Sequence, residues 1–466
     1  MPDFSVIMAS PEVRALVQEN LLQRAFHDAL YPKLMFRSSV TPVLWPANVG
    51  DNMVFTGVGL IKPKMRPLTP GLDPVPSSYQ SEQWDATLQQ YADSIDTHMP
   101  ASMVAIANLF LRNTQQLGLS AGQTINRLVR DRIFAAGMCG WTVATAGVGP
   151  TDHLPVARLN GFTKARYQGT NGSPVKFSPV SASNKLAITV HTSNAGDVAV
   201  NVIGFTPTNS GDETGPGTLI LDGNVTVASR AYVISSDRTY MVNVGGAMSI
   251  DGIGSNDTLK LDSIRSAVAN FWQENVPEMP DGRFHMHLDP TSLSQLYGDS
   301  EMQRLNTALP DYYIYKDFAV GEILGCVLYR NSEEPVPETV SGGLTASYDP
   351  DDPFAGELYA GGTTSGVPIH RPVLLGQGGA YEYYQDMSGL ITEAGVTGKV
   401  GASRISNNGI DVDVERVQLI IRAPLNRLQD MVAASWKFIG DWPIRTDVTT
   451  GDAARYKRVQ QILHGE

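Results

Sequence analysis

Apolar residues recur at helical spacing in three stretches of the chain. The first begins after Ser10, a good N-cap, and Pro11, which suits the first helical position, and it is expected to end before Pro32. Its apolar positions are Val13, Leu16, Val17, Leu21 and Leu22. This stripe predicts an amphipathic helix that packs either on its own core or, as an arm, on a neighbouring subunit.

The longest helical stretch is expected from Thr97 to Gly137, with Pro100 near its start. Its apolar face contains Met103, Ile106, Ala107, Phe110, Leu117, Ile125, Leu128, Val129 and Ile133. Gly118 and Gly122 lower the helix propensity of its middle. Spacing alone therefore fits one long helix and two core helices with a bend equally well.

Between Trp45 and Thr97 the pattern changes to short apolar alternation broken by turn residues. Prolines at positions 63, 67, 70, 74 and 76 exclude a helix and interrupt a central sheet. This composition predicts a long two-stranded excursion with an irregular tip. Because an isolated hairpin is only marginally stable in water, another surface is expected to cover it.

From about Pro150 to Gly246 the helical pattern disappears, and short strand-like runs alternate with Gly, Asn, Asp and Pro turns. Asp222-Gly223 is a specific signal for a two-residue hairpin. About a hundred residues with this spacing predict a small β-sandwich or barrel. Gly-rich segments on both sides, 144–150 and 245–254, indicate an inserted domain.

A third helix is expected from Leu261 to near Pro277, and a strand follows it that carries candidate metal ligands. Alternation along this strand places His285, His287 and Asp289 on one face, as a metal site would need. The same alternation is typical of a half-exposed strand.

The number of further residues that could bind a metal decides between these two interpretations. Hydrolases that use such a pair need further His and Asp ligands, and only His370 and His464 follow. We therefore predict a solvated strand face, and we assign no catalytic, cofactor-binding or metal-binding residue.

Composition limits the function further. The 35 Lys+Arg against 47 Asp+Glu give a net charge of −12, which disfavours a protein that grips nucleic acid by neutralising phosphates. Cys139 and Cys326 are the only cysteines, so the sequence predicts no disulfide framework and folding in a reducing cytoplasm. No window approaches the roughly 18 apolar residues of a membrane helix.

Two stretches, Asp257–Arg330 and Val417–Phe438, carry a family resemblance. The first orders a helix start, a turn, a strand that stops at Asp289-Pro290, and the run Gly321–Tyr329; the second is one long, largely apolar run with a break before Val432. This order resembles the major capsid protein of tailed bacteriophages.

The resemblance implies an α+β fold, the Hong Kong 97-like phage capsid fold, with an inserted all-β domain that departs from the simplest members. The expected division is an N-terminal arm at 1–46, an extended β-hairpin loop at 47–97, a long spine helix with peripheral domain at 98–149, an inserted β-rich domain (immunoglobulin-like or barrel) at 150–250, the peripheral domain continued at 251–290, an axial domain at 291–415, and a return strand of the peripheral domain with a C-terminal tail at 416–466.

The function that the resemblance implies is structural. Copies would self-assemble into hexamers and pentamers of an icosahedral procapsid that matures into the virion shell around double-stranded DNA, without sequence-specific DNA binding, catalysis or a cofactor. The implied partners are neighbouring capsomers, reached through the extended loop and N-terminal arm, and separate scaffolding, portal and decoration proteins, with synthesis in the host cytoplasm and no membrane contact.

Two alternatives stay open. A phage tail, baseplate or adhesin protein would share the β-rich insertion and the low charge, but it leaves the long helix unexplained. A metal-dependent hydrolase would depend on His285, His287 and Asp289 alone.

Overall fold

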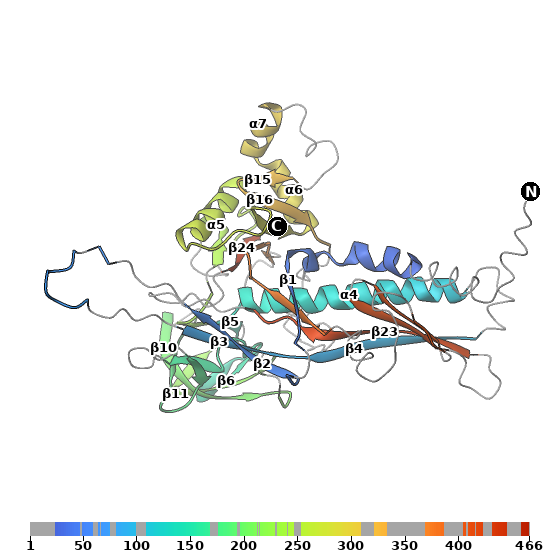
Figure 1. Ribbon diagram of the computed structural model, residues 1–466. Coiled ribbons are helices and arrows are strands. Elements are labelled where there is room, and N and C mark those ends of the chain that lie inside the picture. Colours follow the sequence, from blue (N-terminus) through green and yellow to red (C-terminus); the bar gives the residue numbers. More distant parts are fainter. Residues whose placement is uncertain are drawn as a thin grey trace, which may run out of the picture. The chain divides into compact units, whose positions relative to one another are not determined.

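The structure is a computed structural model with helices and strands mixed along the chain (Figure 1), which confirms the predicted α+β class. It describes residues 24–46, 49–58, 64–65, 67–74, 81–98, 109–167, 176–192, 196–211, 213, 215–228, 231–239, 241–246, 253–308, 321–332, 369–385, 404–406, 409–414, 416–422, 431–444 and 458–465. The chain forms two compact units: Met1–Met53, Asp85–Val129 and Tyr381–Pro443 make the first, and Val54–Trp84, Arg130–Ala380 and Ile444–Glu466 the second.

The first unit is built on a seven-stranded sheet. Its order is β1 (Thr41–Leu44), β19 (Tyr381–Tyr384), β23 (Met431–Asp441), β22 (Val417–Arg422), β21 (Gly409–Val414) and β20 (Arg404–Ser406), and β4 (Gln89–His98) also pairs with β23. β23 presents Ala434, Trp436 and Phe438 to the core at alternate positions, as a strand with one buried face requires. β1 and β19 are parallel, and the other pairs are antiparallel.

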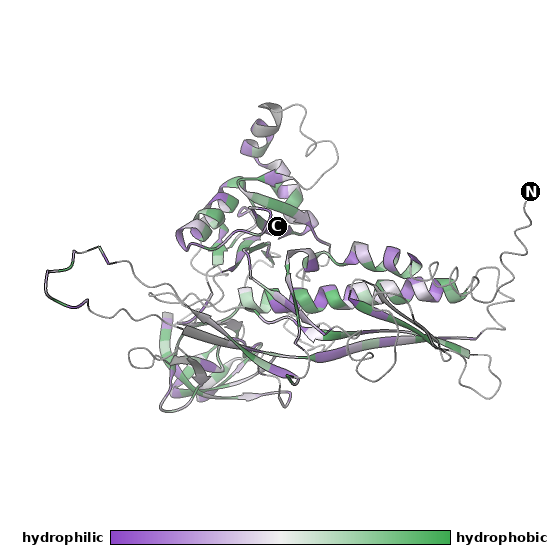
Figure 2. Cartoon of the chain, viewed as in Figure 1, coloured by the Kyte–Doolittle hydropathy of each residue, from purple (hydrophilic) through white to green (hydrophobic). Residues whose placement is uncertain are grey.

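Helix α4 (Leu109–Gly137), whose residues 109–129 belong to this unit, contacts β4. Asn113 donates a hydrogen bond to the Thr97 hydroxyl at 2.8 Å, and both hydrophobic and hydrophilic positions line the helix (Figure 2). The helix ends at Gly137 as predicted, but Thr97 lies in β4, so the predicted start was wrong. Pairing of Thr97 with Val432 on β23 outweighs its position in a helical pattern. Residues 99–108 lie outside the described part.

Gly118 and Gly122 do not break α4; they let a second helix approach it. A Cβ at Gly118 would lie 2.7 Å from the Phe26 carbonyl oxygen, and one at Gly122 would lie 2.8 Å from the Leu30 carbonyl oxygen. Phe26 and Leu30 belong to the helical residues 24–30, which end before Pro32 as predicted and lead into η1 (Tyr31–Lys33). The earlier part of that predicted helix, from Ser10, lies outside the described residues.

A buried ion network ties the segment after η1 to the sheet. Arg37, in η2 (Phe36–Ser39), donates to both carboxylate oxygens of Glu382 on β19, at 2.7 and 2.6 Å, and Arg416 donates to the same carboxylate at 2.8 Å. The Arg37 and Glu382 side chains are only 5% and 1% exposed. Arg416 has a left-handed backbone (φ 67°) and lies between Val414 and Val417, the paired ends of β21 and β22.

The predicted two-stranded excursion is confirmed as β2 (Asn52–Val58) paired with β3 (Ser81–Thr87). The rings of Phe55 and Trp84 stack across the pair with centroids 6.1 Å apart. The described residues of the connecting loop, 64–65 and 67–74, are all exposed, and Figure 1 shows them as an extended trace without secondary structure.

The second unit contains a closed six-stranded barrel. Its order is β5 (Trp141–Val143), β12 (Tyr232–Ser235), β9 (Leu186–Thr192), β10 (Gly196–Pro207), β11 (Gly217–Val227) and β6 (Val148–Val156), and β7 (Lys164–Tyr167) with β8 (Lys176–Pro179) adds a small hairpin. A bridge between Ala144 and Val156, with the Ala157 amide donating to the Val143 carbonyl at 2.9 Å, closes it. Of the predicted sandwich or barrel, the barrel is the one formed.

The predicted hairpin at Asp222-Gly223 was wrong, because β11 runs through both residues. The signal instead marks a bulge, where the register with β6 shifts between Ile220 and Val225. Hydrogen bonds from the Asn201 side chain and amide, and from Lys185, hold the Asp222 carboxylate and lower its pKa to about 2. An Asp-Gly pair can therefore lie within a continuous strand as well as in a hairpin turn.

A second sheet of the same unit has seven strands. Its order is β13 (Met241–Asn243), β24 (Val459–Gly465), β18 (Val373–Leu375), β14 (Phe284–Leu288), β16 (Cys326–Arg330) and β15 (Glu322–Ile323), and β17 (Ile369–His370) pairs with β24. The predicted third helix is confirmed as α5 (Leu261–Gln273), whose buried face packs on this sheet; η3 (Val244–Gly246), α6 (Pro290–Gly298) and α7 (Ser300–Ala308) complete the described elements.

Candidate functional site

The histidines singled out in the sequence lie on β14, which is a central strand of the second sheet. β14 pairs in parallel with β16 and in antiparallel with β18, and all five of its residues are buried. Phe284 packs against Phe271 of α5, while His285 and His287 are buried on the opposite side of the strand. The predicted solvated face was therefore wrong, because alternation of polar and apolar residues does not reveal that both faces are covered.

His285 and His287 share an aromatic neighbour. Their rings lie 5.0 and 5.3 Å from the ring of Tyr329 on β16, and His285 Nε2 contacts Asp281 Oδ2 at 2.9 Å. Burial, with a smaller effect from the charge of His285, lowers the pKa of His287 to about 3. His287 is thus neutral at physiological pH.

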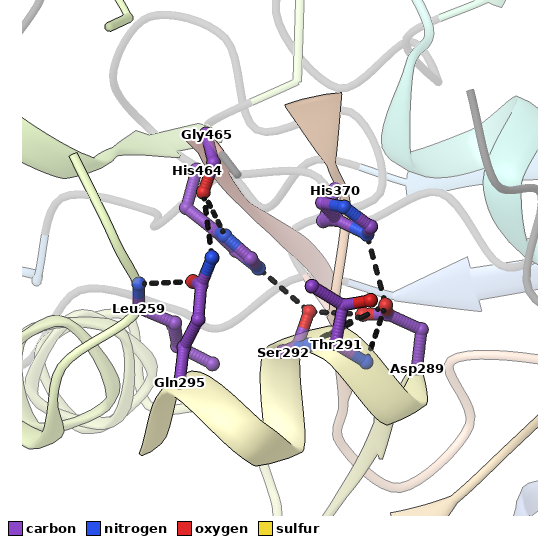
Figure 3. A network of polar contacts seen from close by, with 8 residues as sticks. All are labelled: Leu259, Asp289, Thr291, Ser292, Gln295, His370, His464 and Gly465. Carbon is purple, nitrogen blue, oxygen red and sulfur yellow. Dashed lines mark hydrogen bonds and ion pairs between the residues drawn. The ribbon is translucent and has the colours of Figure 1, made fainter. Parts of the chain in front are cut away.

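Asp289, the third residue of the predicted cluster, belongs to a different network (Figure 3). It is the N-cap of α6 and accepts hydrogen bonds from the amides of Thr291 and Ser292 at 3.1 and 3.3 Å. Its other close partners are the Ser292 hydroxyl and His370 Nδ1, the latter 2.8 Å away. Burial would raise the pKa of Asp289, but the hydrogen bond and charge of His370 outweigh that effect and lower it.

His464 on β24 completes this network. Its Nε2 lies 2.6 Å from the Ser292 hydroxyl, its Nδ1 lies 3.1 Å from the Gly465 carbonyl oxygen, and its ring stacks on His370 with centroids 5.3 Å apart. Gln295 donates to the Gly465 carbonyl and accepts from the Leu259 amide, both at 2.9 Å (Figure 3). Burial lowers the pKa of His464 to about 4.

Asp289, Ser292 and His464 are the residue types of a nucleophilic triad in a different arrangement. In such a triad the acid orients the imidazole, whereas Asp289 here contacts the serine, and the His464 nitrogen on the far side faces a backbone carbonyl. All three side chains are buried. The network caps α6 and joins that helix to β17 and β24.

No group of three His, Cys, Asp or Glu side chains in the described part of the chain is placed to hold a metal ion. The network of Figure 3 was not predicted as a unit from the sequence. Asp289-Pro290 is a helix-start signal that could have located the N-cap, but nothing in the sequence places His370 and His464 beside it.

The exposed apolar side chains form a second candidate site. Four of them lie on β2 or in the loop that follows it: Val54 (59% exposed), Met65 (90%), Leu68 (59%) and Leu72 (64%). An isolated exposed apolar residue needs no explanation, but several on one extended segment mark a surface for contact with another molecule.

No protein-family model matches the sequence, and no curated protein sequence matches it. Among solved structures, the chain is similar to the capsid of Ralstonia phage GP4, with 13% sequence identity, a TM-score of 0.47, and coverage of 93% of this chain and 91% of that one. It is also similar to the capsid of Cyanophage P-SCSP1u (9%, TM-score 0.46, coverage 92% and 88%) and to that of Cyanophage Pam1 (11%, TM-score 0.45, coverage 90% and 86%). All three are phage capsids.

None of the helices described in the structure has the length and apolar character to span a membrane.

Proposed function

We propose that this chain is the major capsid protein of a tailed phage and that copies of it assemble into a closed shell around double-stranded DNA. The observation that carries the proposal is the β2–β3 hairpin with its exposed loop. Met65, Leu68 and Leu72 gain nothing from the chain's own core, and burying each against another copy would contribute about 1.5–3 kcal/mol. An extended element of this kind serves assembly better than it serves the folding of a single subunit.

The first unit, which contains residues 109–129 of α4, suits the frame of a shell wall. α4 is one continuous helix of 29 residues packed on a long-stranded sheet. The buried Arg37–Glu382–Arg416 network fixes η2, which contains Arg37, to that sheet. A wall must transmit force between neighbours, and tightly packed interiors resist deformation. The role is structural rather than catalytic, and the net charge of −12 suits a wall that encloses DNA without gripping it.

The finer assignments belong to the same proposal. Copies form hexamers and pentamers, and the extended loop and N-terminal arm reach neighbouring capsomers. Separate scaffolding, portal and decoration proteins bind to the shell, which lies in the virion after assembly in the host cytoplasm.

Electron microscopy of the purified full chain tests this function. We expect closed shells, or isolated five- and six-membered rings that close into shells when the protein is concentrated. Fibres or stacked rings would favour a tail, baseplate or adhesin protein instead. Small particles with stoichiometric zinc or manganese would favour the hydrolase.

We also propose the predicted domain division, with the β-rich insertion as an independently folding domain that starts at β5 rather than at residue 150. The barrel has its own core, which includes Leu154, Val190 and Leu219, and its strands close on themselves. Because β5 at Trp141 is needed for closure, a fragment of residues 138–244 is expected to give a dispersed amide spectrum and a cooperative melt. The matched fragment 152–244 lacks β5 and part of β6 and should melt at a lower temperature. Amide spectra typical of a disordered chain from both fragments would contradict the proposal that the insertion folds independently.

A further inference from the structure

We propose that β24 (Val459–Gly465) is an acid-sensitive latch, which leaves the second sheet as the pH falls below about 6 while the barrel stays folded. The latch is the buried contact of His464 with Ser292 and His370, above the Asp289 N-cap of α6. This inference does not depend on the proposed function.

β24 is buried and is paired with strands on both edges. His464 is its only titratable side chain. The strand lies between β13 and β18, and His464 pairs with His370 of β17. All seven residues of β24 are buried, and Ile462 belongs to the core cluster beneath α5. Releasing the strand would therefore uncover that core.

The charged surroundings of His464 come from few elements. Asp289 at the start of α6 and His370 on β17 are the titratable groups nearest to it, and β13, β18 and η3 carry no charged residue. On α5, Asp262 and Arg265 pair with each other at the exposed surface. Asp257, whose carbonyl accepts the Gly465 amide, uses its carboxylate to bind the Gly254 amide at 2.8 Å.

The contacts of His464 also contain one hydrogen too few at neutral pH. Three contacts link four groups in series: the Gly465 carbonyl to His464, His464 to the Ser292 hydroxyl, and the Ser292 hydroxyl to the Asp289 carboxylate. Each contact needs one hydrogen to be a hydrogen bond, and the carbonyl and the carboxylate at the two ends can only accept. Ser292 supplies one hydrogen and a neutral imidazole supplies another. A second proton on His464 would complete the row, but it would place an imidazolium in a buried site beside His370.

Burial decides which effect prevails. The pKa of His464 is lowered to about 4, below its usual value of 6.5, so the folded strand takes up a proton less readily than the released strand does. For a base with a lowered pKa, the stability is complete above the unfolded value and is lost as the pH falls from about 6.5 towards about 4. His287 on β14, whose pKa is lowered to about 3, acts in the same direction on the same sheet.

Hydrogen–deuterium exchange of the full chain tests the latch at several pH values from 7.5 to 4.5, with labelling times corrected for intrinsic exchange. Between pH 7.5 and about 5.5 the opening equilibrium of peptides covering β24 should rise about tenfold from His464 alone. Peptides from barrel strands β9 and β10 in the same sample should keep their protection, since His153 and His191 in the barrel are exposed.

Two variants separate the latch from a general acid effect. His464→Gln keeps a neutral hydrogen-bonding side chain and should lose most of the pH response of β24, whereas His153→Gln, the matched control in the barrel, should retain all of it. If His464→Gln does not fold, the wild-type profile alone decides, with the barrel as its internal reference. Equal protection of β24 at every pH, or loss of barrel and β24 protection together, would overturn the proposal.

Discussion

Deleting residues 63–80 is expected to give a folded, soluble subunit that no longer closes into shells. The deletion removes the loop between β2 and β3, including Met65, Leu68 and Leu72, and leaves every core residue of the sheets and the barrel in place. Circular dichroism and the melting temperature should stay close to those of the full chain, while electron microscopy should show no closed shells. The loss should be complete, because each copy would lack the same contact.

Point variants make the same test without shortening the chain. Met65→Ser, Leu68→Ser and Leu72→Ser combined remove the exposed apolar surface, and we expect them to prevent or strongly slow shell closure. Asp73→Asn is the matched control, since it alters an exposed polar residue in the same loop, and it should assemble normally. Normal shells from the deletion variant would show that this loop is not an assembly element.

Glu382→Ala is expected to be the most destabilising single substitution in the first unit, lowering the free energy of unfolding by about 3–5 kcal/mol. The change leaves Arg37, which is almost fully buried, without the carboxylate that it contacts through two nitrogens, and it removes the same partner from Arg416. Urea denaturation followed by tryptophan fluorescence measures the effect, since Trp436 and Trp442 are buried in this unit.

Glu322→Ala provides the matched control for that measurement. Glu322 pairs with Arg283 at the surface, where both side chains are more than one third exposed, so the loss should stay below about 1 kcal/mol. A Glu382→Ala effect as small as that of Glu322→Ala would mean that water reaches the Arg37–Glu382 pair.

Much of the secondary structure could be predicted because local spacing and local chemistry agree with the fold. The apolar repeat of α5, the end of α4 at Gly137 and the two-stranded excursion follow from residues close together in the sequence. The glycines of α4 were harder to interpret, since their use depends on the backbone of Phe26 and Leu30, which spacing within α4 does not report.

The errors share one physical cause, which is a partner far away in the sequence. His285 and His287 alternate as an exposed strand would, yet neighbouring strands and packed side chains bury both. Asp222-Gly223 reads as a turn, yet Asn201 and Lys185 hold the Asp222 carboxylate within a continuous strand. The network around Asp289 joins residues from positions 259 to 465, so no local pattern could reveal it.

The position of β24 also sets the order in which the chain can fold. β24 pairs with β13 through Met241 and Gln461, which lie 220 residues apart (461 minus 241), whereas the paired ends of β9 and β10 in the barrel, Thr192 and Gly196, lie only four residues apart (196 minus 192). Contacts between distant residues cost more loop-closure entropy and form more slowly than local ones. During synthesis the barrel can fold as soon as it leaves the ribosome, while the sheet that contains β13, β14 and β18 is incomplete until β24, the strand between β13 and β18, has been made. The interval between these events is when the apolar residues beneath α5 are most open to aggregation or to a chaperone.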